Sequence, residues 1–219
     1  MALDHLAEVY GEPSIPEARP LFELVLRENV AYLVDDAARE RAFDELRLRV
    51  GLSPDALLAA SADDLQSVTG HGILAEHQAD KLREIARITV QDFQGDLEQV
   101  RQLPFREARR ALMKYPSIGE PGAEKILLFG RAFTVLGLES NGVRVLTRLG
   151  LVAEARNYSA TYREVQRHVA PFADRGFDWL IRAYLLLRQH GHELCHRSRP
   201  ICSGCPLNQE CAFVLKPQI

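Results

Sequence analysis

The four cysteines of the chain stand together near its carboxyl end. Cys195, Cys202, Cys205 and Cys211 follow the spacing C-x6-C-x2-C-x5-C, and the sequence holds no other cysteine. Thiolates bind soft metals, and four of them match the ligand count of a [4Fe-4S] cluster. A zinc ribbon usually offers two C-x2-C pairs, whereas here only Cys202 and Cys205 form one. The spacing predicts a metal site over 195–211, with iron–sulfur and zinc both open on these residues alone.

Arginines lie inside this cysteine loop. Arg197 and Arg199 project from its first segment, and Pro200 and Pro206 stiffen it. Arginine binds phosphate through paired N–H groups, so both arginines are candidates for contact with a nucleic-acid backbone. The alternative is a basic surface that only offsets the negative charge of the metal site.

Residues 111–129 predict two helices joined by a tight turn. The first helix would end near Tyr115, the turn would be built on Ser117 and Gly119, and Pro121 would stand in the first turn of the second helix. Small residues let a backbone approach closely, and N–H groups at a helix start can hold a phosphate. The alternative is a purely structural connection.

The charges are distributed unevenly along the chain. The net charge is −3, but eleven Lys and Arg stand against six Asp and Glu from Arg144 onward, and sixteen against twenty-four before it. The C-terminal third is therefore the part that could meet a polyanion, with a solvated charged face as the alternative. With 47% apolar and 26% charged residues, the composition excludes wholesale disorder and a disulfide-stapled miniprotein.

The elements that must position these residues are helices. Apolar residues recur three and four positions apart, and alternating strand patterns are scarce, so the sequence predicts an all-α protein. Ser53 and Ser61 are placed to cap the helices that follow them. Three stripes comprise Phe22, Leu26, Val30 and Leu33, then Phe43, Leu46 and Val50, and then Leu82, Ile85 and Ile88.

The sequence pattern favours a protein that is neither membrane-spanning nor exported. No apolar run reaches the length of a membrane-spanning helix, and the first residues carry acids and prolines where a secretory signal would be basic and then apolar. We expect a cytoplasmic protein, associated with the nucleoid if its source is bacterial.

Taken together, the cysteine spacing, the hairpin Tyr115-Pro116-Ser117-Ile118-Gly119 and the segment 138–145 resemble the endonuclease III family of helix-hairpin-helix DNA glycosylases. Phe22-Glu23-Leu24 and His190-Gly191 also resemble segments of that family, and the match runs from about 22 to 213. The resemblance favours a [4Fe-4S] cluster over zinc. It implies that the DNA contacts include Ser117, Ile118, Gly119, Gly122, Leu33, Asn141, Arg197 and Arg199.

The resemblance also implies two helical domains that flank a DNA-binding cleft. Residues 21–138 would form a bundle that carries the helix-hairpin-helix motif at about 111–129. Residues 1–20 and 139–219 would form the iron–sulfur domain, with the cluster loop at 195–211. Leu33 falls where the family has a glutamine that fills the gap left by a flipped base, so it would act as an apolar wedge; a buried core leucine is the alternative.

Both catalytic positions depart from the family pattern. The family reads G-x-K after the hairpin, whereas this chain reads Gly119-Glu120-Pro121, and proline cannot act as the amine nucleophile. Lys125 lies four residues later, on the same helix face, and is the candidate replacement; a solvated helical lysine is the alternative.

Glu139 stands in Glu139-Ser140-Asn141, where the family reads Asp-Thr-His. The carboxylate survives with one more methylene, and a shift of about 1 Å can cost roughly a hundredfold in rate, so slower or altered chemistry is expected. Asn141 keeps a hydrogen-bonding side chain without a titratable ring. A surface or helix-capping acid is the alternative for Glu139.

The resemblance thus predicts a monomeric base-excision repair glycosylase that acts on double-stranded DNA containing a damaged base or an abasic site. It would cleave the N-glycosidic bond, with lyase activity if Lys125 reaches the sugar. The alternatives are a DNA-binding protein of the same fold that recognises damage without turnover, and a zinc-dependent binding protein unrelated to repair.

Overall fold

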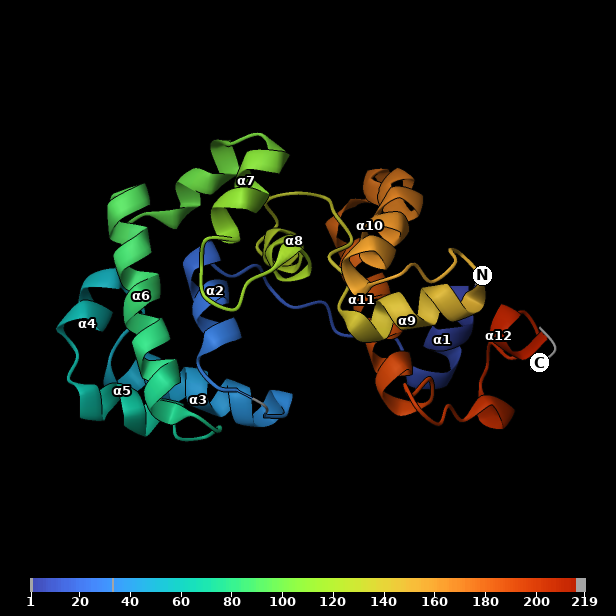
Figure 1. Ribbon diagram of the computed structural model, residues 1–219, viewed down its shortest axis with the longest axis horizontal. Coiled ribbons are helices and arrows are strands. Elements are labelled where there is room, and N and C mark those ends of the chain that lie inside the picture. Colours follow the sequence, from blue (N-terminus) through green and yellow to red (C-terminus); the bar gives the residue numbers. More distant parts are fainter. Residues whose placement is uncertain (1, 33, 216–219) are drawn as a thin grey trace. The chain divides into compact units, whose positions relative to one another are not determined.

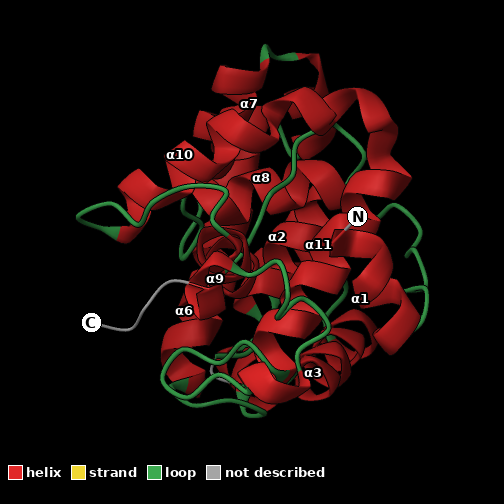
Figure 2. Cartoon of the chain, turned by 90° about the vertical axis from the view of Figure 1, so that its right-hand side faces the viewer, coloured by secondary structure: helices red, strands yellow, loops and turns green. Residues whose placement is uncertain are grey.

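The structure is a computed structural model that describes residues 2–32 and 34–215. Regular secondary structure in these residues is wholly helical, so the predicted all-α class is confirmed (Figures 1 and 2). None of the described helices combines the length and apolar character that a bilayer span requires. The elements are α1 (Ala2–Tyr10), α2 (Leu21–Asn29), α3 (Asp36–Arg49), α4 (Pro54–Ala59), α5 (Ala62–Thr69), α6 (Ala75–Phe93), η1 (Leu97–Gln102), α7 (Phe105–Leu112), α8 (Glu120–Phe129), α9 (Ser140–Leu149), α10 (Tyr158–Val169), η2 (Ala170–Arg175), α11 (Gly176–Glu193), η3 (Cys202–Gly204) and α12 (Ala212–Leu215).

The chain folds as two compact units. The hairpin unit comprises Ala18–Ile126, and the cysteine unit comprises Met1–Glu17 with Leu127–Ile219, so the division falls inside α8. The predicted functional domains, 21–138 against 1–20 with 139–219, divide the chain elsewhere and stay a prediction.

The hairpin unit is built around α6, against which α2, α4 and α5 pack. The two predicted serine caps are confirmed: Ser53 Oγ accepts a hydrogen bond from the Ala56 N–H at 3.1 Å, and Ser61 Oγ accepts one from the Asp64 N–H at 3.0 Å. Such caps satisfy N–H groups that a helix start leaves without acceptors. The apolar stripes of these helices face inward, and their buried members include Phe22, Leu26, Phe43, Leu46, Leu82 and Ile85.

The cysteine unit is built around α11, which packs against α9 and α1, while α10 and α12 pack against α9. Close approach of α9 and α11 depends on Gly191, because a Cβ there would lie 2.6 Å from the Asn141 Cβ. Gly191 therefore brings the start of α9 beside the end of α11, where the cysteine loop begins.

Candidate functional site

The predicted hairpin is present, with a shorter first helix than expected. α7 ends at Leu112, and the bond from the Tyr115 N–H to the Leu112 carbonyl tightens the last turn before the hairpin. Ser117 adopts the left-handed conformation with φ of 60°, and its Oγ accepts a hydrogen bond from Lys81 Nζ at 2.9 Å. Pro121 lies in the first turn of α8, as predicted.

The side chains of the hairpin turn divide between solvent and core. Ser117 and Gly119 are exposed, whereas Ile118 is 6% exposed and anchors the turn from below. Gly119 accepts the first helical bond of α8, from the Ala123 N–H at 2.9 Å. The Ile118 side chain is therefore closed to a ligand and its N–H donates to the Tyr115 carbonyl at 3.2 Å, whereas Ser117 and Gly119 lie at the surface.

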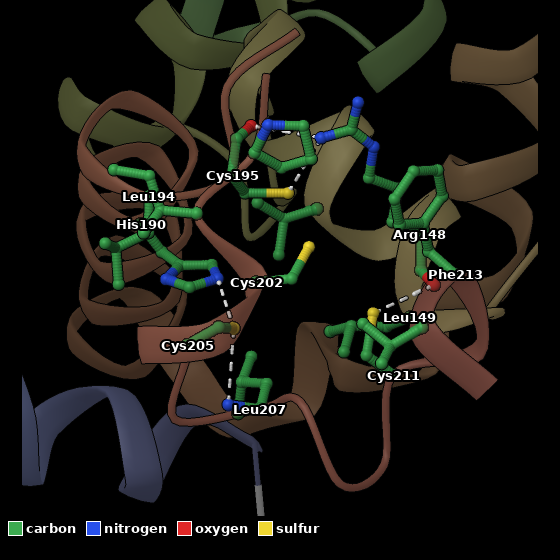
Figure 3. Close-up of a pocket in the computed structure, with 14 residues that line it drawn as sticks. Arg148, Leu149, His190, Leu194, Cys195, Cys202, Cys205, Leu207, Cys211 and Phe213 are labelled. Atoms are coloured by element: carbon green, nitrogen blue, oxygen red, sulfur yellow. Dashed lines mark hydrogen bonds between the residues drawn. The ribbon is translucent and has the colours of Figure 1, made fainter. Parts of the chain in front are cut away.

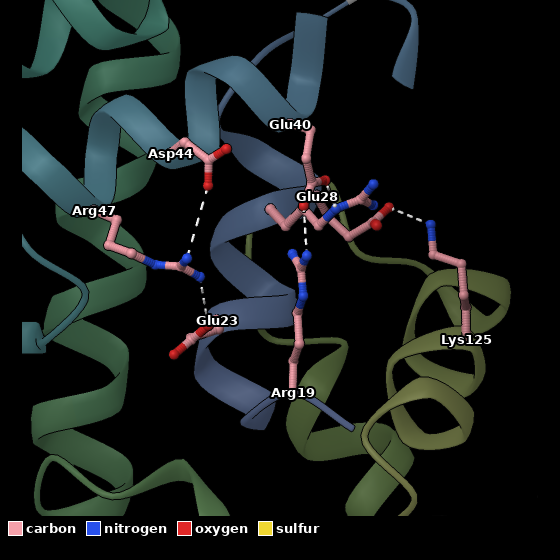
Figure 4. Close-up of polar contacts among 8 residues, drawn as sticks. Arg19, Glu23, Glu28, Glu40, Asp44, Arg47 and Lys125 are labelled. Carbon is pink, nitrogen blue, oxygen red and sulfur yellow. Dashed lines mark hydrogen bonds and ion pairs between the residues drawn. The ribbon is translucent and has the colours of Figure 1, made fainter. Parts of the chain in front are cut away.

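Lys125 projects from α8 toward α2, where its Nζ lies 2.6 Å from Glu28 Oε2 (Figure 4). The side chains are 21% and 19% exposed, so the pair is largely shielded from water. Glu40, on the neighbouring α3, binds Arg19 and Arg27 instead. A lysine held as an ammonium has no lone pair, so Lys125 would have to leave Glu28 and lose a proton before it could act as a nucleophile.

Glu139 stands at the N-cap position of α9, but its side chain makes no capping hydrogen bond. One oxygen accepts from Asn141 Nδ2 at 2.7 Å, and the other lies 3.7 Å from Arg188 Nε on α11. The side chain is 31% exposed. The positive end of the α9 dipole stabilises this carboxylate. The Glu139 carboxylate is thus oriented and half-buried, and it makes no hydrogen bond to the N–H groups at the start of α9.

Asn141 connects Glu139 to the cysteine loop through Arg144. The Asn141 amide donates to Glu139, and its oxygen accepts from Arg144 Nη2 at 2.5 Å. The Arg144 guanidinium also donates to the carbonyls of Gly191 at 2.7 Å and Cys195 at 2.7 Å. Because both ends of the Asn141 amide are bonded, its orientation is fixed, and the position of the carboxylate depends on the backbone that carries the first cysteine.

The four cysteines line one pocket at the end of α11 and are free of disulfides (Figure 3). Their sulfurs face a common space from different sides. Among the described residues, no three metal-binding side chains converge on a single point as the ligands of one ion would. The pocket is otherwise mostly apolar, with Val145, Leu149, Leu194, Ile201, Leu207, Phe213 and Val214 among its lining residues.

Hydrogen-bond donors surround the sulfurs. The Cys205 sulfur accepts from the Leu207 N–H at 3.4 Å and lies 3.6 Å from His190 Nε2, while Arg148 Nη1 lies 3.3 Å from the Cys195 sulfur. Burial is the main cause that raises the pKa of the Cys205 thiol, and the charges of the other three cysteines raise it further.

These residues fit a [4Fe-4S] cluster. In such a cluster each thiolate binds a different iron atom. The four sulfurs therefore need to surround a shared space and do not need to converge on one point. Donors to the sulfurs and an apolar shell stabilise a cluster of this kind. Cys195, Cys202, Cys205 and Cys211 would hold it.

The remaining predicted DNA contacts are placed as follows. Arg197 and Arg199 are exposed on the cysteine loop, and Gly122 lies in the first turn of α8, where an added Cβ would meet Ile118 Cγ2 at 3.6 Å. Leu33 lies outside the described residues, so its predicted role as a wedge has no structural account. The contacts assigned to all these residues stay predictions.

Several residues of the site were not singled out from the sequence. Arg148 follows Arg144 by four residues, a spacing that puts both on one face of α9 and could have signalled a shared target. Ile73 and Leu74 are 53% and 59% exposed in a loop where Leu74 has φ of 59°. Exposed apolar side chains on a left-handed backbone are unusual, and the sequence gives no signal of either property.

The fold and the site together define an all-α protein with a helix-hairpin-helix motif, a four-thiol pocket and an oriented carboxylate between them in sequence. No family model matches the chain. Two curated relatives are named endonuclease III: the protein of Sulfolobus acidocaldarius is 22% identical over 91% of this chain and 85% of its own length. The protein of Thermotoga maritima is 23% identical over 89% and 82%.

A solved structure agrees with these relatives. A trapped covalent intermediate of endonuclease III with DNA superposes with a TM-score of 0.74 at 19% identity, over 97% of this chain and 93% of that one. The chain is endonuclease III-like over most of its length and has the same helical fold. The predicted resemblance is confirmed, and the low identities mark a divergent sequence.

Proposed function

We propose that the protein is a DNA base-excision repair glycosylase that cleaves the N-glycosidic bond of a damaged nucleotide in duplex DNA. The observation that carries the proposal is Glu139: a half-buried carboxylate that makes no capping bond and is held by Asn141, which Arg144 joins to the start of the cysteine loop. The likeness to proteins named endonuclease III and to a DNA complex of one supports DNA as the substrate. We expect it to work as a monomer at DNA in the cytoplasm.

The carboxylate would act on the sugar. Departure of the base leaves positive charge on the sugar ring, and a fixed anion near that charge lowers the barrier. Glu139 would stabilise the cation and direct a water molecule or an amine to the sugar carbon. The longer side chain, relative to aspartate, would place the charge differently and slow the reaction.

The base must leave the stack before the bond can break, which costs a few kcal/mol and requires contacts that hold the opened duplex. The exposed hairpin at Ser117 and Gly119 would bind the backbone through its main chain, together with the Gly122 N–H at the helix start. Ile73 and Leu74 are exposed apolar side chains suited to fill the vacated space.

The [4Fe-4S] cluster, held by the four cysteines, would have a structural role. Through these cysteines the cluster would tie together the end of α11, the loop 195–211 and the start of α12. Arg144 and Arg148 bond the carbonyls of this loop, so the cluster would also fix the support of Asn141. The loop would present Arg197 and Arg199 to phosphates.

Lyase activity at abasic sites is a separate step of the proposal and depends on Lys125. Its ion pair with Glu28 would have to open when DNA binds, so that the amine could form a Schiff base with the sugar. Borohydride reduction in the presence of an abasic duplex would then yield a covalent adduct, absent in Lys125→Ala. A wild-type protein that releases base but forms no adduct would be a glycosylase without lyase activity.

A second candidate is a damage-recognising DNA-binding protein without turnover. The observations that favour it are Pro121 at the expected nucleophile position and the engagement of Lys125 by Glu28. Such a protein would bind abasic or damaged duplexes in a salt-dependent manner and release neither base nor strand fragments.

A panel of lesion-containing duplexes, assayed separately for free base and for strand scission, distinguishes these candidates. Release of base from at least one lesion supports the glycosylase. Tight binding with no product on any lesion supports the binding protein, and absence of binding contradicts both.

A further inference from the structure

A second pocket of the cysteine unit lies at the starts of α9 and α10. It is formed by α9, the connection that follows it, the first turn of α10 and one residue of the cysteine loop. Ser140, the neighbour of Glu139, is among its lining residues, so the pocket borders the candidate carboxylate. The lining residues used below are Arg144, Arg148, Arg156, Arg197, Glu154 and Tyr158.

The pocket carries excess positive charge. Arg144 and Arg148 donate mainly to carbonyl and amide oxygens, which have no net charge to offset the guanidinium. Arg156 and Arg197 are exposed, and neither side chain has an acidic partner among the described residues. Glu154 is an opposing acidic group in the lining. Four arginines against one carboxylate make the pocket suited to an anion.

The four arginines have different freedom. Arg148 donates to the carbonyls of His196 at 2.7 Å and Arg197 at 2.9 Å, so it holds the loop that presents the Arg197 side chain. Arg144 is held in the same way by Gly191 and Cys195. Arg156 stands on the connection between α9 and α10, whereas Arg197 stands on the cysteine loop. Two fixed arginines therefore position the wall of the pocket, and two exposed arginines are available to a ligand.

An aromatic side chain connects the pocket to Glu139. Tyr158, the first residue of α10, is 45% exposed. Burial of its hydroxyl and then the nearby charge of Glu139 raise the pKa of Tyr158 to about 12. Because Ser140 and Tyr158 both line the pocket, a ligand there would lie near the carboxylate of Glu139, with an exposed ring at its side.

We propose that this pocket binds a backbone phosphate of the DNA strand whose damaged nucleotide meets Glu139, with Arg156 and Arg197 as the contact residues. The inference rests on the proposed function and extends it to a specific phosphate site. Arg144 and Arg148 are positioning residues. The site brings together a residue of the cysteine loop and a residue of the α9–α10 connection, which is outside every motif that the sequence resemblance used.

The test is the salt dependence of binding to a short fluorescein-labelled undamaged duplex, measured by anisotropy. Arg156→Ala and Arg197→Ala should each flatten the slope of log Kd against log salt by about 0.9 and weaken binding by about eightfold near 0.1 M salt, as loss of one phosphate contact requires. Glu154→Gln should tighten binding. Arg167→Ala is the matched control, because Arg167 is 71% exposed and pairs with Glu164 on the same helix.

The outcomes separate this inference from the function that it extends. If Arg156→Ala and Arg167→Ala change the slope equally, or not at all, while the wild type still binds DNA and releases base, the phosphate site is wrong and the glycosylase stands. If the wild type neither binds duplex nor releases base from the lesion panel, both are wrong. A specific loss in Arg156→Ala and Arg197→Ala with a gain in Glu154→Gln supports the site.

Discussion

Lys125 and Glu139 are the two candidate catalytic side chains, and their surroundings differ. Lys125, in the hairpin unit, is paired with a carboxylate at 2.6 Å and is closed off on α2. Glu139, in the cysteine unit, is oriented by an amide and borders a basic pocket. A charged group at a family position is therefore informative only together with its partners: Lys125 is held by a carboxylate at 2.6 Å, whereas Glu139 is held by an amide and by the more distant guanidinium of Arg188 at 3.7 Å.

The largest expected effect is on base release, and it follows loss of the metal from the cysteine unit. The purified protein should be brown and contain about four iron atoms per chain. Cys202→Ser should remove most of that iron and abolish base release, because the loop that supports Arg144 and Asn141 loses its cross-links. Iron analysis, visible absorption and the base-release assay check this. Stoichiometric zinc with negligible iron, or full activity without metal, would contradict it.

A substitution at Gly191 should have a smaller effect, because it changes only how α9 packs on α11 beside Glu139. A methyl group in Gly191→Ala would collide with Asn141 and push the start of α9 away, so base release should fall by about tenfold to a hundredfold. Gly204→Ala is the control, because an added Cβ there meets nothing within 4 Å. Equal rates for the two variants at equal iron content would show that the placement of α9 does not govern the carboxylate.

Parts of this site could be predicted because their signals are local. All four thiols of the pocket lie within 195–211, and the hairpin turn and the serine caps are each encoded in a few consecutive residues. The ion pair of Lys125 joins residues 97 apart, and the contact of Arg148 with the Cys195 sulfur joins residues 47 apart. Such contacts depend on packing between helices, so no spacing rule in the sequence signals them.

Stability measurements test how firmly Glu28 holds Lys125. Lys125→Met and Glu28→Gln should each lower the free energy of unfolding by about 1–2 kcal/mol, and a double-mutant cycle should give a coupling near 1 kcal/mol, because the pair is largely shielded. The exposed pair Arg167–Glu164 is the matched control, with an expected coupling below about 0.5 kcal/mol. Denaturant unfolding measures both. A coupling no larger than that of the control would mean that Glu28 holds Lys125 only loosely.

The smallest expected effect concerns the packing behind the hairpin. Tyr115 is buried, its hydroxyl lies 2.9 Å from Thr89 Oγ1, and burial raises the pKa of Tyr115 to about 12. The neutral hydroxyl therefore contributes stability below about pH 10, and this contribution is lost as the pH rises toward 12. Tyr115→Phe should be less stable by about 1 kcal/mol at neutral pH, and the difference should shrink above pH 10.

Unfolding free energies of the wild type and Tyr115→Phe between neutral pH and pH 11 check this prediction. The remaining tyrosines are the same in both proteins, so the difference between the two isolates Tyr115. A difference that stays constant across this range would show that the hydroxyl does not lose its proton more readily on unfolding.

The carboxylate of Glu139 is the group on which the proposed reaction depends most. Single-turnover release of free base, on whichever duplex of the lesion panel the wild type processes fastest, should fall by about a thousandfold in Glu139→Gln, while the Kd for that duplex changes less than about threefold. Base release by Glu139→Gln at close to the wild-type rate would contradict the assignment.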